Sequence, residues 1–476
     1  MRRATQFAIG MLLLCAVAIP VQATTITVTN SNDSGPGSLR QALADVNDGD
    51  TINFAVTGTI GLTSGELAVN KSITISGPGA DSLAVFSNTF RIFHVMPGPT
   101  VTIAGLTIRG GFVQFDFGGG ILNDHATLTL TNCAVDVNEA FGGGGIYNDG
   151  AGGSATLTIV DSTVNGNLAT GGNVGIGGGG IYNDGSLTII NSTISGNFAD
   201  SGFPYNLGIA GGIFSQGGTL TITNSTIAGN FAGNRGGGIS SCSTLAITDS
   251  IVSGNGAGGG KNNWPGSGGG IEACGTVTIS NSTISGNSVS GRDFKEPGFG
   301  GGIYAVGTVT ISNSTLSDNL VLNYGNGGGI WNGETVEIGN TILNSGEPDN
   351  IFSSFGTVTS NGYNLSSDNG GGYLNGPGDQ INTDPLLGPL QDNVGPTLTY
   401  ALLPGSPAID AGDPNFTPPP WYDQRGPDFW RLRNGHIDIG SFEVQSGAKV
   451  TPTPTPTPRP SPTPRSRPTP LPRPTP

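Results

Sequence analysis

Two or three glycines followed by isoleucine recur along the chain at a spacing near 30 residues. Successive copies are 25 to 35 residues apart, and the variation in length falls in one part of the repeat. This is typical of a solenoid, in which each repeat forms one rung and loops absorb the differences in length. The isoleucines of the motif are Ile121, Ile146, Ile181, Ile213, Ile239, Ile271, Ile303 and Ile330.

Within each repeat, Leu-Thr-Ile or Val-Thr-Ile is followed by Asn or Asp, then by Ser-Thr-Ile or a relative, and then by Gly-Asn. Short β-branched runs separated by glycine and asparagine predict short strands joined by tight turns. Leucine-rich repeats and propeller blades require other periods. The fold class is therefore all-β, and we predict a right-handed parallel β-helix, because parallel crossovers are nearly always right-handed.

Aligning the repeats produces two columns of asparagine, in which stacked amides are expected to bond along the solenoid axis and to the backbone of the turns. The first column is Asn132, Asp161, Asn191, Asn224, Asp249, Asn281, Asn313 and Asn340. The second is Asn138, Asn167, Asn197, Asn230, Asn255, Asn287 and Asn319.

The chain divides into five segments. Residues 1–23 have the basic start, short apolar stretch and small final residue of a secretory signal, and no later stretch could span a membrane. Residues 24–50 form an N-terminal cap with a short amphipathic helix that begins after Ser38, and residues 51–375 form the β-helix. Residues 376–445 form a separate C-terminal segment, in which the Pro- and Gly-rich residues 385–443 are expected to close the far end. Residues 446–476 are a disordered Thr/Pro-rich tail.

The charge of the chain restricts its partners. Without the two arginines of the leader and the five basic residues after Ala448, 11 Lys and Arg stand against 33 Asp and Glu, a net charge of −22. Nucleic acid and anionic membranes are therefore unfavourable partners. Cys242 and Cys274 occupy the same position in successive repeats, so in an exported protein they either form a disulfide or stack as two small residues.

Several segments resemble known families. Gly35–Ala42 with Asp48–Ile52 is similar to the N-terminal segment of bacterial secreted right-handed β-helix proteins, and the GGGI and Ser-Gly-Asn elements resemble the repeats of chlamydial polymorphic outer-membrane proteins. The run from Asp384 to Glu443, with Leu403-Pro404-Gly405-Ser406-Pro407-Ala408-Ile409-Asp410 and Asp423-Gln424-Arg425-Gly426, resembles the choice-of-anchor Q domain. The resemblance implies export and a secreted or cell-surface location. It brings no catalytic residues.

Two sets of residues are candidate sites. Asp124, Asp149 and Asp184 follow the motif isoleucine by three residues in successive repeats, and they form either solvated turns or a weak Ca²⁺ site. The variable loops contain Phe203, Tyr205, Lys261, Trp264, Arg292, Phe294 and Lys295. These side chains either contact a sugar or a protein partner or fold back onto the solenoid.

Two functions follow from these observations. The first is a non-catalytic surface or extracellular protein, such as an adhesin or envelope component, that binds a polysaccharide or a surface protein through loops on one face. The alternative is a carbohydrate-active enzyme, either a polysaccharide lyase or a glycoside hydrolase. The sequence contains neither Gly-His-Gly nor Arg-x-Lys, which favours the first function. No cofactor is required in either case, although Ca²⁺ is possible.

Overall fold

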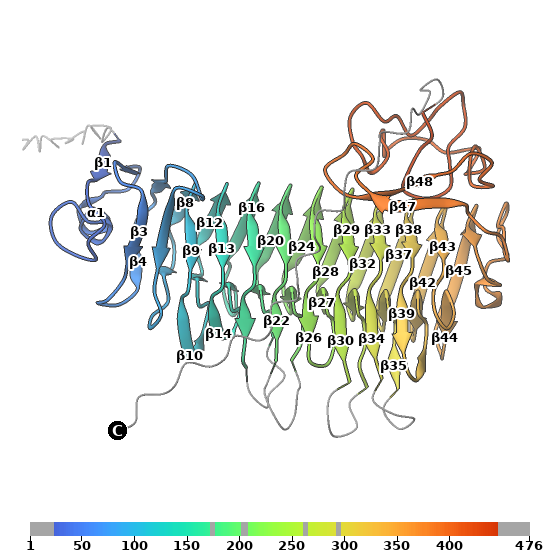
Figure 1. Ribbon diagram of the computed structural model, residues 1–476, viewed down its shortest axis with the longest axis horizontal. Coiled ribbons are helices and arrows are strands. Elements are labelled where there is room, and N and C mark those ends of the chain that lie inside the picture. Colours follow the sequence, from blue (N-terminus) through green and yellow to red (C-terminus); the bar gives the residue numbers. More distant parts are fainter. Residues whose placement is uncertain (1–22, 172–176, 201–207, 260–264, 292–296, 446–476) are drawn as a thin grey trace, which may run out of the picture. The chain divides into compact units, whose positions relative to one another are not determined.

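The computed structural model describes residues 23–171, 177–200, 208–259, 265–291 and 297–445. The predicted signal peptide, apart from Ala23, and the predicted Thr/Pro-rich tail lie outside these ranges. Within them the chain forms a right-handed parallel β-helix of about 11 turns, so the predicted fold class is confirmed (Figure 1). No helix among the described residues is both long enough and apolar enough to cross a membrane.

Four parallel sheets run along the solenoid, and each rung adds one strand to most of them. The 13-stranded sheet contains β1 (Thr25–Val28), β2 (Thr51–Phe54), β5 (Thr74–Ser76), β8 (Thr100–Ala104), β12 (Thr127–Thr131), β16 (Thr156–Val160), β20 (Ser186–Ile190), β24 (Thr219–Thr223), β28 (Thr244–Thr248), β32 (Thr276–Ser280), β37 (Thr308–Ser312), β42 (Thr335–Gly339) and β45 (Thr357–Gly362). The 12-stranded sheet contains β3 (Gly58–Gly61), β6 (Leu83–Phe86), β9 (Thr107–Arg109), β13 (Ala134–Asp136), β17 (Thr163–Asn165), β21 (Thr193–Ser195), β25 (Thr226–Ala228), β29 (Ile251–Ser253), β33 (Thr283–Ser285), β38 (Thr315–Ser317), β43 (Ile342–Asn344) and β46 (Leu365–Ser366).

The other two large sheets complete each rung. The 11-stranded sheet contains β4 (Leu67–Val69), β7 (Phe93–Val95), β11 (Ile121–Asp124), β15 (Ile146–Asp149), β19 (Ile181–Asn183), β23 (Ile213–Ser215), β27 (Ile239–Ser241), β31 (Ile271–Ala273), β36 (Ile303–Ala305), β41 (Ile330–Asn332) and β44 (Ile351–Ser353). The 8-stranded sheet contains β10 (Phe112–Phe117), β14 (Glu139–Gly142), β18 (Leu168–Ala169), β22 (Phe198–Ala199), β26 (Phe231–Ala232), β30 (Gly256–Gly258), β34 (Ser288–Ser290) and β39 (Leu320–Leu322). Two small sheets pair β35 (Gly298–Phe299) with β40 (Gly325–Asn326), and β47 (Leu387–Gln391) with β48 (Thr399–Leu402).

The motif isoleucines form one column of the core. Register pairs Ile146 with Ile181 and Ile181 with Ile213, and all three side chains are fully buried. The preceding glycines are required because neighbouring rungs approach closely at this position. A Cβ atom on Gly179 would lie 2.5 Å from the carbonyl oxygen of Gly211, which is a steric clash.

Both predicted asparagine columns are present. In the second column the amide nitrogen of Asn167 donates to Oδ1 of Asn197 at 2.9 Å, and Asn197 donates in the same way to Asn230. Each amide also bonds to the backbone, as when Nδ2 of Asn197 donates to the carbonyl of Val164 at 3.0 Å. Residues of the first column all have positive φ, near +50°, which asparagine and aspartate tolerate better than other side chains at a tight corner. The columns therefore supply both the turns and their hydrogen bonds.

We expect Asn197→Ala to lower the free energy of unfolding by about 3 kcal/mol, because an unsatisfied buried polar group costs about 1–3 kcal/mol and this change creates several. The backbone N–H of Asn167 and the carbonyl of Val164 would both lose a partner. Chemical denaturation measures the effect. The matched control is the exposed Asn165→Ala, for which we expect a change within about 0.5 kcal/mol. Equal effects of the two changes would contradict the structural role of the column.

A short helix covers the N-terminal end of the solenoid. Helix α1 (Leu39–Asp45) begins after Ser38, whose Oγ accepts from the backbone N–H of Gln41 at 3.2 Å, as the sequence predicts. It packs Leu39 and Leu43 on the core. Strand β1, which precedes the helix within the predicted cap, is the first strand of the 13-stranded sheet and pairs with β2.

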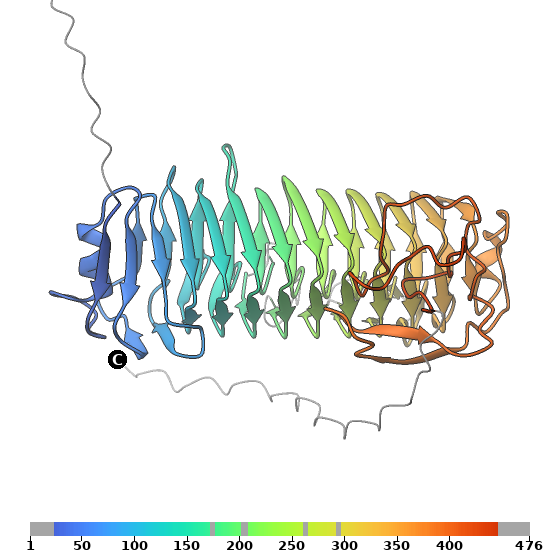
Figure 2. The same cartoon turned by 90° about the horizontal axis from the view of Figure 1, so that it is seen from above.

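The prediction that residues 385–443 close the far end is wrong. This segment lies against the side of the 12-stranded sheet, over the C-terminal rungs, as Figures 1 and 2 show. Its Ile439 and Phe442 pack on Ile342 and Leu365. The last rung is covered instead by the 3-10 helix η2 (Gly370–Gly372) and the following Leu374, which joins the main core. This segment has no strand periodicity, so its sequence does not indicate which surface of the β-helix it covers.

Candidate functional site

The second residue of each strand in the 11-stranded sheet points outward, because side chains alternate between the two faces of a strand. The residue before it, which is isoleucine in most strands, Leu67 in β4 and Phe93 in β7, faces the core. Register therefore stacks one outward column along the whole sheet. That column is Ala68, His94, Leu122, Tyr147, Tyr182, Phe214, Ser240, Glu272, Tyr304, Trp331 and Phe352.

Charged side chains gather at the N-terminal end of this face, and we call them the charged cluster: Glu66, Arg91, His94, Asp116, Asp124, His125 and Asp149. Arg91 is 4 % exposed and holds the cluster together. Its Nη1 lies 2.6 Å from Oε2 of Glu66, and its Nη2 lies 2.6 Å from Oδ2 of Asp116. Its Nε donates to the carbonyls of Phe117 and Gly118 at 3.1 Å.

His94 links two rungs of the cluster. Its Nδ1 lies 3.0 Å from Oε1 of Glu66, and its Nε2 lies 3.4 Å from Oδ2 of Asp124. Both partners are carboxylates, so both ring nitrogens donate when the imidazole is protonated. The Glu66 hydrogen bond raises the pKa of His94 above its usual value, while the hydrogen bond from His94 and the charge of Arg91 lower the pKa of Glu66. The pair of His94 with Asp124 joins strands β7 and β11.

His125 holds the other oxygen of Asp124. Its Nδ1 lies 2.6 Å from Oδ1 of Asp124, and its Nε2 lies 2.9 Å from the carbonyl oxygen of Ala151. A carbonyl and a carboxylate are both acceptors, so this geometry suits the imidazolium form. The hydrogen bond to Asp124 raises the pKa of His125 accordingly. Asp124 is thus oriented by two histidines, one on each carboxylate oxygen.

Asp149 lies beside Asp124. The two residues are direct partners in the register of β11 and β15, and single donor atoms of Asp124, His125 and Asp149 lie within 4.8 Å of one another. Asp184 follows on the next rung, where burial and then the charge of Asp149 raise its pKa. Asp124 and Asp149 of the predicted aspartate column are therefore stacked in register, and Asp184 follows the end of the next strand, close enough to Asp149 for its charge to act. Each carboxylate oxygen of Asp124 already bonds to a histidine, and we derive no chemistry from a metal here.

Aromatic rings continue the face beyond the charged cluster. The centroids of Phe117 and Tyr147 are 4.6 Å apart, those of Tyr147 and Tyr182 are 4.8 Å apart, and those of Tyr182 and Phe214 are 5.0 Å apart. Phe117 and Tyr147 are half-buried, whereas Tyr182 and Phe214 are buried against Ile209. Burial raises the pKa of Tyr182 to about 12, so its hydroxyl stays neutral. Of these four rings, Phe117 and Tyr147 are the accessible ones, and Tyr147 lies on the same face of β15 as Asp149.

The remaining predicted site residues have different outcomes. Phe203, Tyr205, Lys261, Trp264, Arg292, Phe294 and Lys295 lie outside the described residues, so the loop-face prediction stays a prediction. Cys242 and Cys274 form a disulfide, with their Cα atoms 4.4 Å apart. The sequence interpretation missed Glu66, Arg91, His94, Asp116 and His125. Glu66, Arg91 and His94 join the aspartates only when the early, irregular rungs are aligned with the regular ones, whereas His125 directly follows Asp124 in the sequence and was a signal that could have been used.

Comparison with known proteins adds to the description of the fold. No protein-family model and no curated protein sequence matches the chain. Among solved structures, pectate lyase Pel9A is similar over 90 % of this chain and 98 % of its own, with 17 % identity and a TM-score of 0.47. The PL6 family alginate lyase AlyGC is similar over 79 % of this chain and 55 % of its own, with 14 % identity and a TM-score of 0.34. ORF18 of Geobacillus virus E2 is similar over 72 % of this chain and 61 % of its own, with 14 % identity and a TM-score of 0.36.

Proposed function

We propose that this chain is an exported carbohydrate-active β-helix protein that binds an extended, uncharged glycan along the outer face of its 11-stranded sheet. The observation that carries the proposal is that the half-buried ring of Tyr147 stacks on Phe117 and lies two residues before Asp149 on the same face of β15, where Asp149 pairs in register with Asp124. Aromatic rings contact the apolar C–H groups of a pyranose, and carboxylates accept hydrogen bonds from its hydroxyls. Aromatic rings and carboxylates together are typical of a sugar-binding surface.

The spacing of the face favours an extended glycan. Rungs of a parallel β-helix repeat at about 4.8 Å, the spacing of neighbouring strands. A β-1,4-linked hexose chain advances by a similar length for each sugar, so successive sugars could meet equivalent positions on successive rungs. A second group of half-buried rings, Tyr304 and Trp331, with centroids 4.6 Å apart, lies further along the same column. This arrangement suits a ligand of several sugars.

The charge of the face favours an uncharged glycan over a polyuronide. Glu66, Asp116, Asp124, Asp149 and Asp184 outnumber Arg91 and the two histidines, and Arg91 is buried within its ion pairs. An acidic surface repels a polyanion unless cations screen it. The net charge of −22 on the chain between the leader and the tail likewise disfavours binding of a polyuronide.

A second candidate function, glycoside hydrolysis, is favoured by one observation. A carboxylate oxygen of Asp124 lies within 4.8 Å of one of Asp149, close to the separation of about 5–5.5 Å in glycosidases that retain anomeric configuration. Elimination from a uronate is less favoured, because it requires a free base and a group that neutralises the uronate carboxylate. Arg91, the arginine of the charged cluster, is already paired with two acids.

We further propose that the protein is secreted or held at the cell surface. The signal-like residues 1–23 and the resemblance of residues 384–443 to the choice-of-anchor Q domain support this proposal.

Affinity electrophoresis in gels that contain one soluble polysaccharide tests the proposal. We expect hydroxyethylcellulose, xylan or galactomannan to retard the protein, and polygalacturonate and alginate not to do so. Tyr147→Ala should weaken retardation by about three- to tenfold, since an aromatic contact contributes about 0.5–1.5 kcal/mol. The control is Trp421→Ala, which removes a ring that is 59 % exposed on the C-terminal segment. Binding to none of the uncharged polysaccharides would refute the proposed function.

A further inference from the structure

The outer face of the 13-stranded sheet carries two columns of threonine that the proposed function does not use. In each strand of this sheet from β8 to β37, the first and third residues point outward, because the second and fourth are buried in the core. Register joins the first residues into one column and the third residues into another. We call both columns together the threonine array: Thr100, Thr127, Thr156, Ser186, Thr219, Thr244, Thr276 and Thr308, with Thr102, Thr129, Thr158, Thr188, Thr221, Ala246, Thr278 and Thr310.

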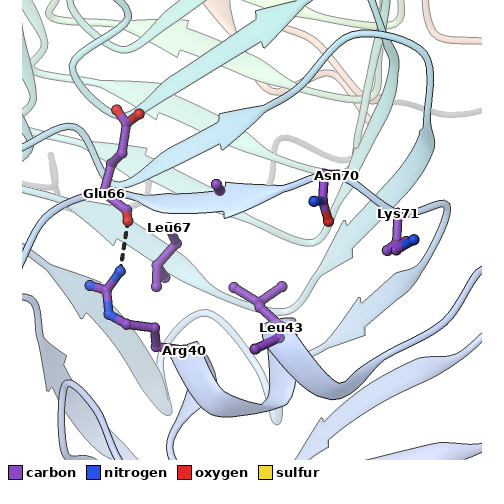
Figure 3. Close-up of a pocket in the computed structure, with 8 residues that line it drawn as sticks. Arg40, Leu43, Glu66, Leu67, Asn70 and Lys71 are labelled. Carbon is purple, nitrogen blue, oxygen red and sulfur yellow. Dashed lines mark hydrogen bonds between the residues drawn. The ribbon is translucent and has the colours of Figure 1, made fainter.

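Strand propensity alone does not explain the composition of this face. Val, Ile and Tyr suit a strand as well as Thr does. The 12-stranded sheet is built from the same repeat, yet it places Arg109 and Asp136 outward. The cavity between helix α1 and strand β4 is likewise lined by charged residues, Arg40, Glu66 and Lys71, as Figure 3 shows. Along β8 to β37 of the 13-stranded sheet, all of which the structure describes, no outward residue is charged or aromatic. The threonine array therefore suits an uncharged partner that does not stack on rings.

The threonine array is a regular grid. Every pairing of neighbouring strands from β8 to β37 keeps its register without a shift. Neighbours within a column are therefore about 4.8 Å apart, and the two columns are about 6.7 Å apart, which is the length of two residues of a strand. The eight strands span about 34 Å, and Figures 1 and 2 show the rungs stacked in a straight row. Threonine is stiff at χ1, so its methyl and hydroxyl groups repeat with the same spacings.

The hydroxyls of the threonine array are available to water. Within the described part of the chain, the one side-chain hydrogen bond that they form joins Thr219 to Ser186 at 3.4 Å. A threonine hydroxyl both donates and accepts, whereas the methyl group beside it does neither. A grid of alternating hydroxyl and methyl groups therefore imposes its own spacing on the water that covers it.

From this we infer that the threonine array binds ice. Oxygen atoms on the prism face of hexagonal ice also form a rectangular grid, with repeats close to the two spacings of the array. Water molecules held by the hydroxyls can thus belong to the crystal lattice, and a bridging water is nearly as favourable as a direct hydrogen bond. The partner is uncharged, as the array requires. This site is independent of the proposed glycan-binding face, which lies on the 11-stranded sheet.

Partition of the full-length protein into slowly growing ice tests the inference. We expect the protein to be enriched in the ice and to slow the recrystallisation of ice grains. Thr188→Tyr places a bulky ring in the middle of the second column, so it should remove most of both effects. The matched control is Thr163→Tyr, which places the same ring on the exposed face of the 12-stranded sheet and should change neither effect. Thr221→Lys, at an exposed position of the array, is a second variant in case Thr188→Tyr does not fold.

The outcomes also separate ice from other partners. Exclusion of the unmodified protein from ice, with recrystallisation as fast as without protein, would overturn the inference. Equal losses in Thr188→Tyr and Thr163→Tyr would overturn it as well, since the array would then not be responsible. If Thr188→Tyr loses binding to microcrystalline cellulose and not to ice, the face binds a crystalline polysaccharide instead. Retardation by soluble polysaccharides should be the same in all variants, so failure of the proposed function leaves this test unaffected. Circular dichroism of each variant confirms that the fold is retained.

Discussion

Replacing Arg431 with methionine is expected to lower the free energy of unfolding by about 3–5 kcal/mol, the usual cost of removing one partner from a buried ionic network. The Arg431 side chain is fully buried between the C-terminal segment and the β-helix. Its Nη2 donates to Oδ1 of Asn281 at 2.8 Å and to the carbonyls of Asn313 and Gly440 at 3.1 and 2.7 Å. Methionine fills most of the volume but leaves these acceptors unpaired. Chemical denaturation measures the loss.

The reason for this large effect is that Arg431 joins two parts of the chain. Asn281 and Asn313 belong to the corner column of the solenoid, whereas Gly440 belongs to the segment that packs on the side of the 12-stranded sheet. We therefore expect limited proteolysis to cut the variant within residues 385–443 before the β-helix is cut. The exposed Arg109→Met is the matched control, with an expected change below about 0.5 kcal/mol. Identical digestion of variant and unmodified protein would contradict this role.

A second variant tests the titration of Glu443, the acid next to Arg431. Oε2 of Glu443 lies 3.6 Å from Nη1 of Arg431, and burial, with the charge of Asp438, raises the pKa of Glu443 to about 9. The folded chain therefore keeps a proton that the unfolded chain loses above its ordinary pKa near 4.5. Stability from this group falls as pH rises between those two values. Glu443→Gln should remove this pH dependence of stability. Its stability should exceed that of the unmodified protein most at the alkaline end of the range.

The solenoid could be predicted because its signals repeat. The motif isoleucines and the asparagine columns each recur in seven or eight copies, so alignment of the repeats reveals which positions stack. The same alignment places Asp124 beside Asp149. It fails for Glu66, Arg91 and His94, because the rungs that contain them lack the Gly-Gly-Ile motif and therefore fall outside the aligned set.

Contacts outside the repeat could not be predicted from the sequence for a different reason. Arg431 binds Asn281 across 150 residues of sequence, and no local pattern in the Pro-rich segment indicates that partner. The charged cluster likewise depends on side chains about 25 to 30 residues apart that meet only when rungs stack. Rung stacking fixes backbone register first, and the pairing of individual charges follows from it. The sequence therefore predicted the solenoid and, within the candidate site, only the aspartates Asp124 and Asp149.

If the protein cleaves its glycan, Asp149→Asn and Asp124→Asn should each lower kcat by about 10²–10⁴, the contribution of a positioned acid or base, and leave glycan affinity almost unchanged. Asp124 is oriented by His94 and His125, which suits it to act as the nucleophile, and Asp149 is the partner acid within 4.8 Å. Reducing-sugar release from xylan, galactomannan and hydroxyethylcellulose measures the rate. The exposed Asp81→Asn serves as the control and should retain full activity.

The stereochemical outcome provides a sharper test of the same pair. Carboxyl groups this close leave no room for a water molecule between the second carboxylate and the anomeric carbon, so cleavage should proceed through a covalent glycosyl intermediate with retention of anomeric configuration. Proton NMR of the first product formed distinguishes retention from inversion. Inversion would remove Asp124 and Asp149 as the catalytic pair. Binding without any product from the unmodified protein would exclude hydrolysis and leave a non-catalytic glycan-binding protein, since Tyr147 and the acidic face act in recognition whether or not a bond is broken.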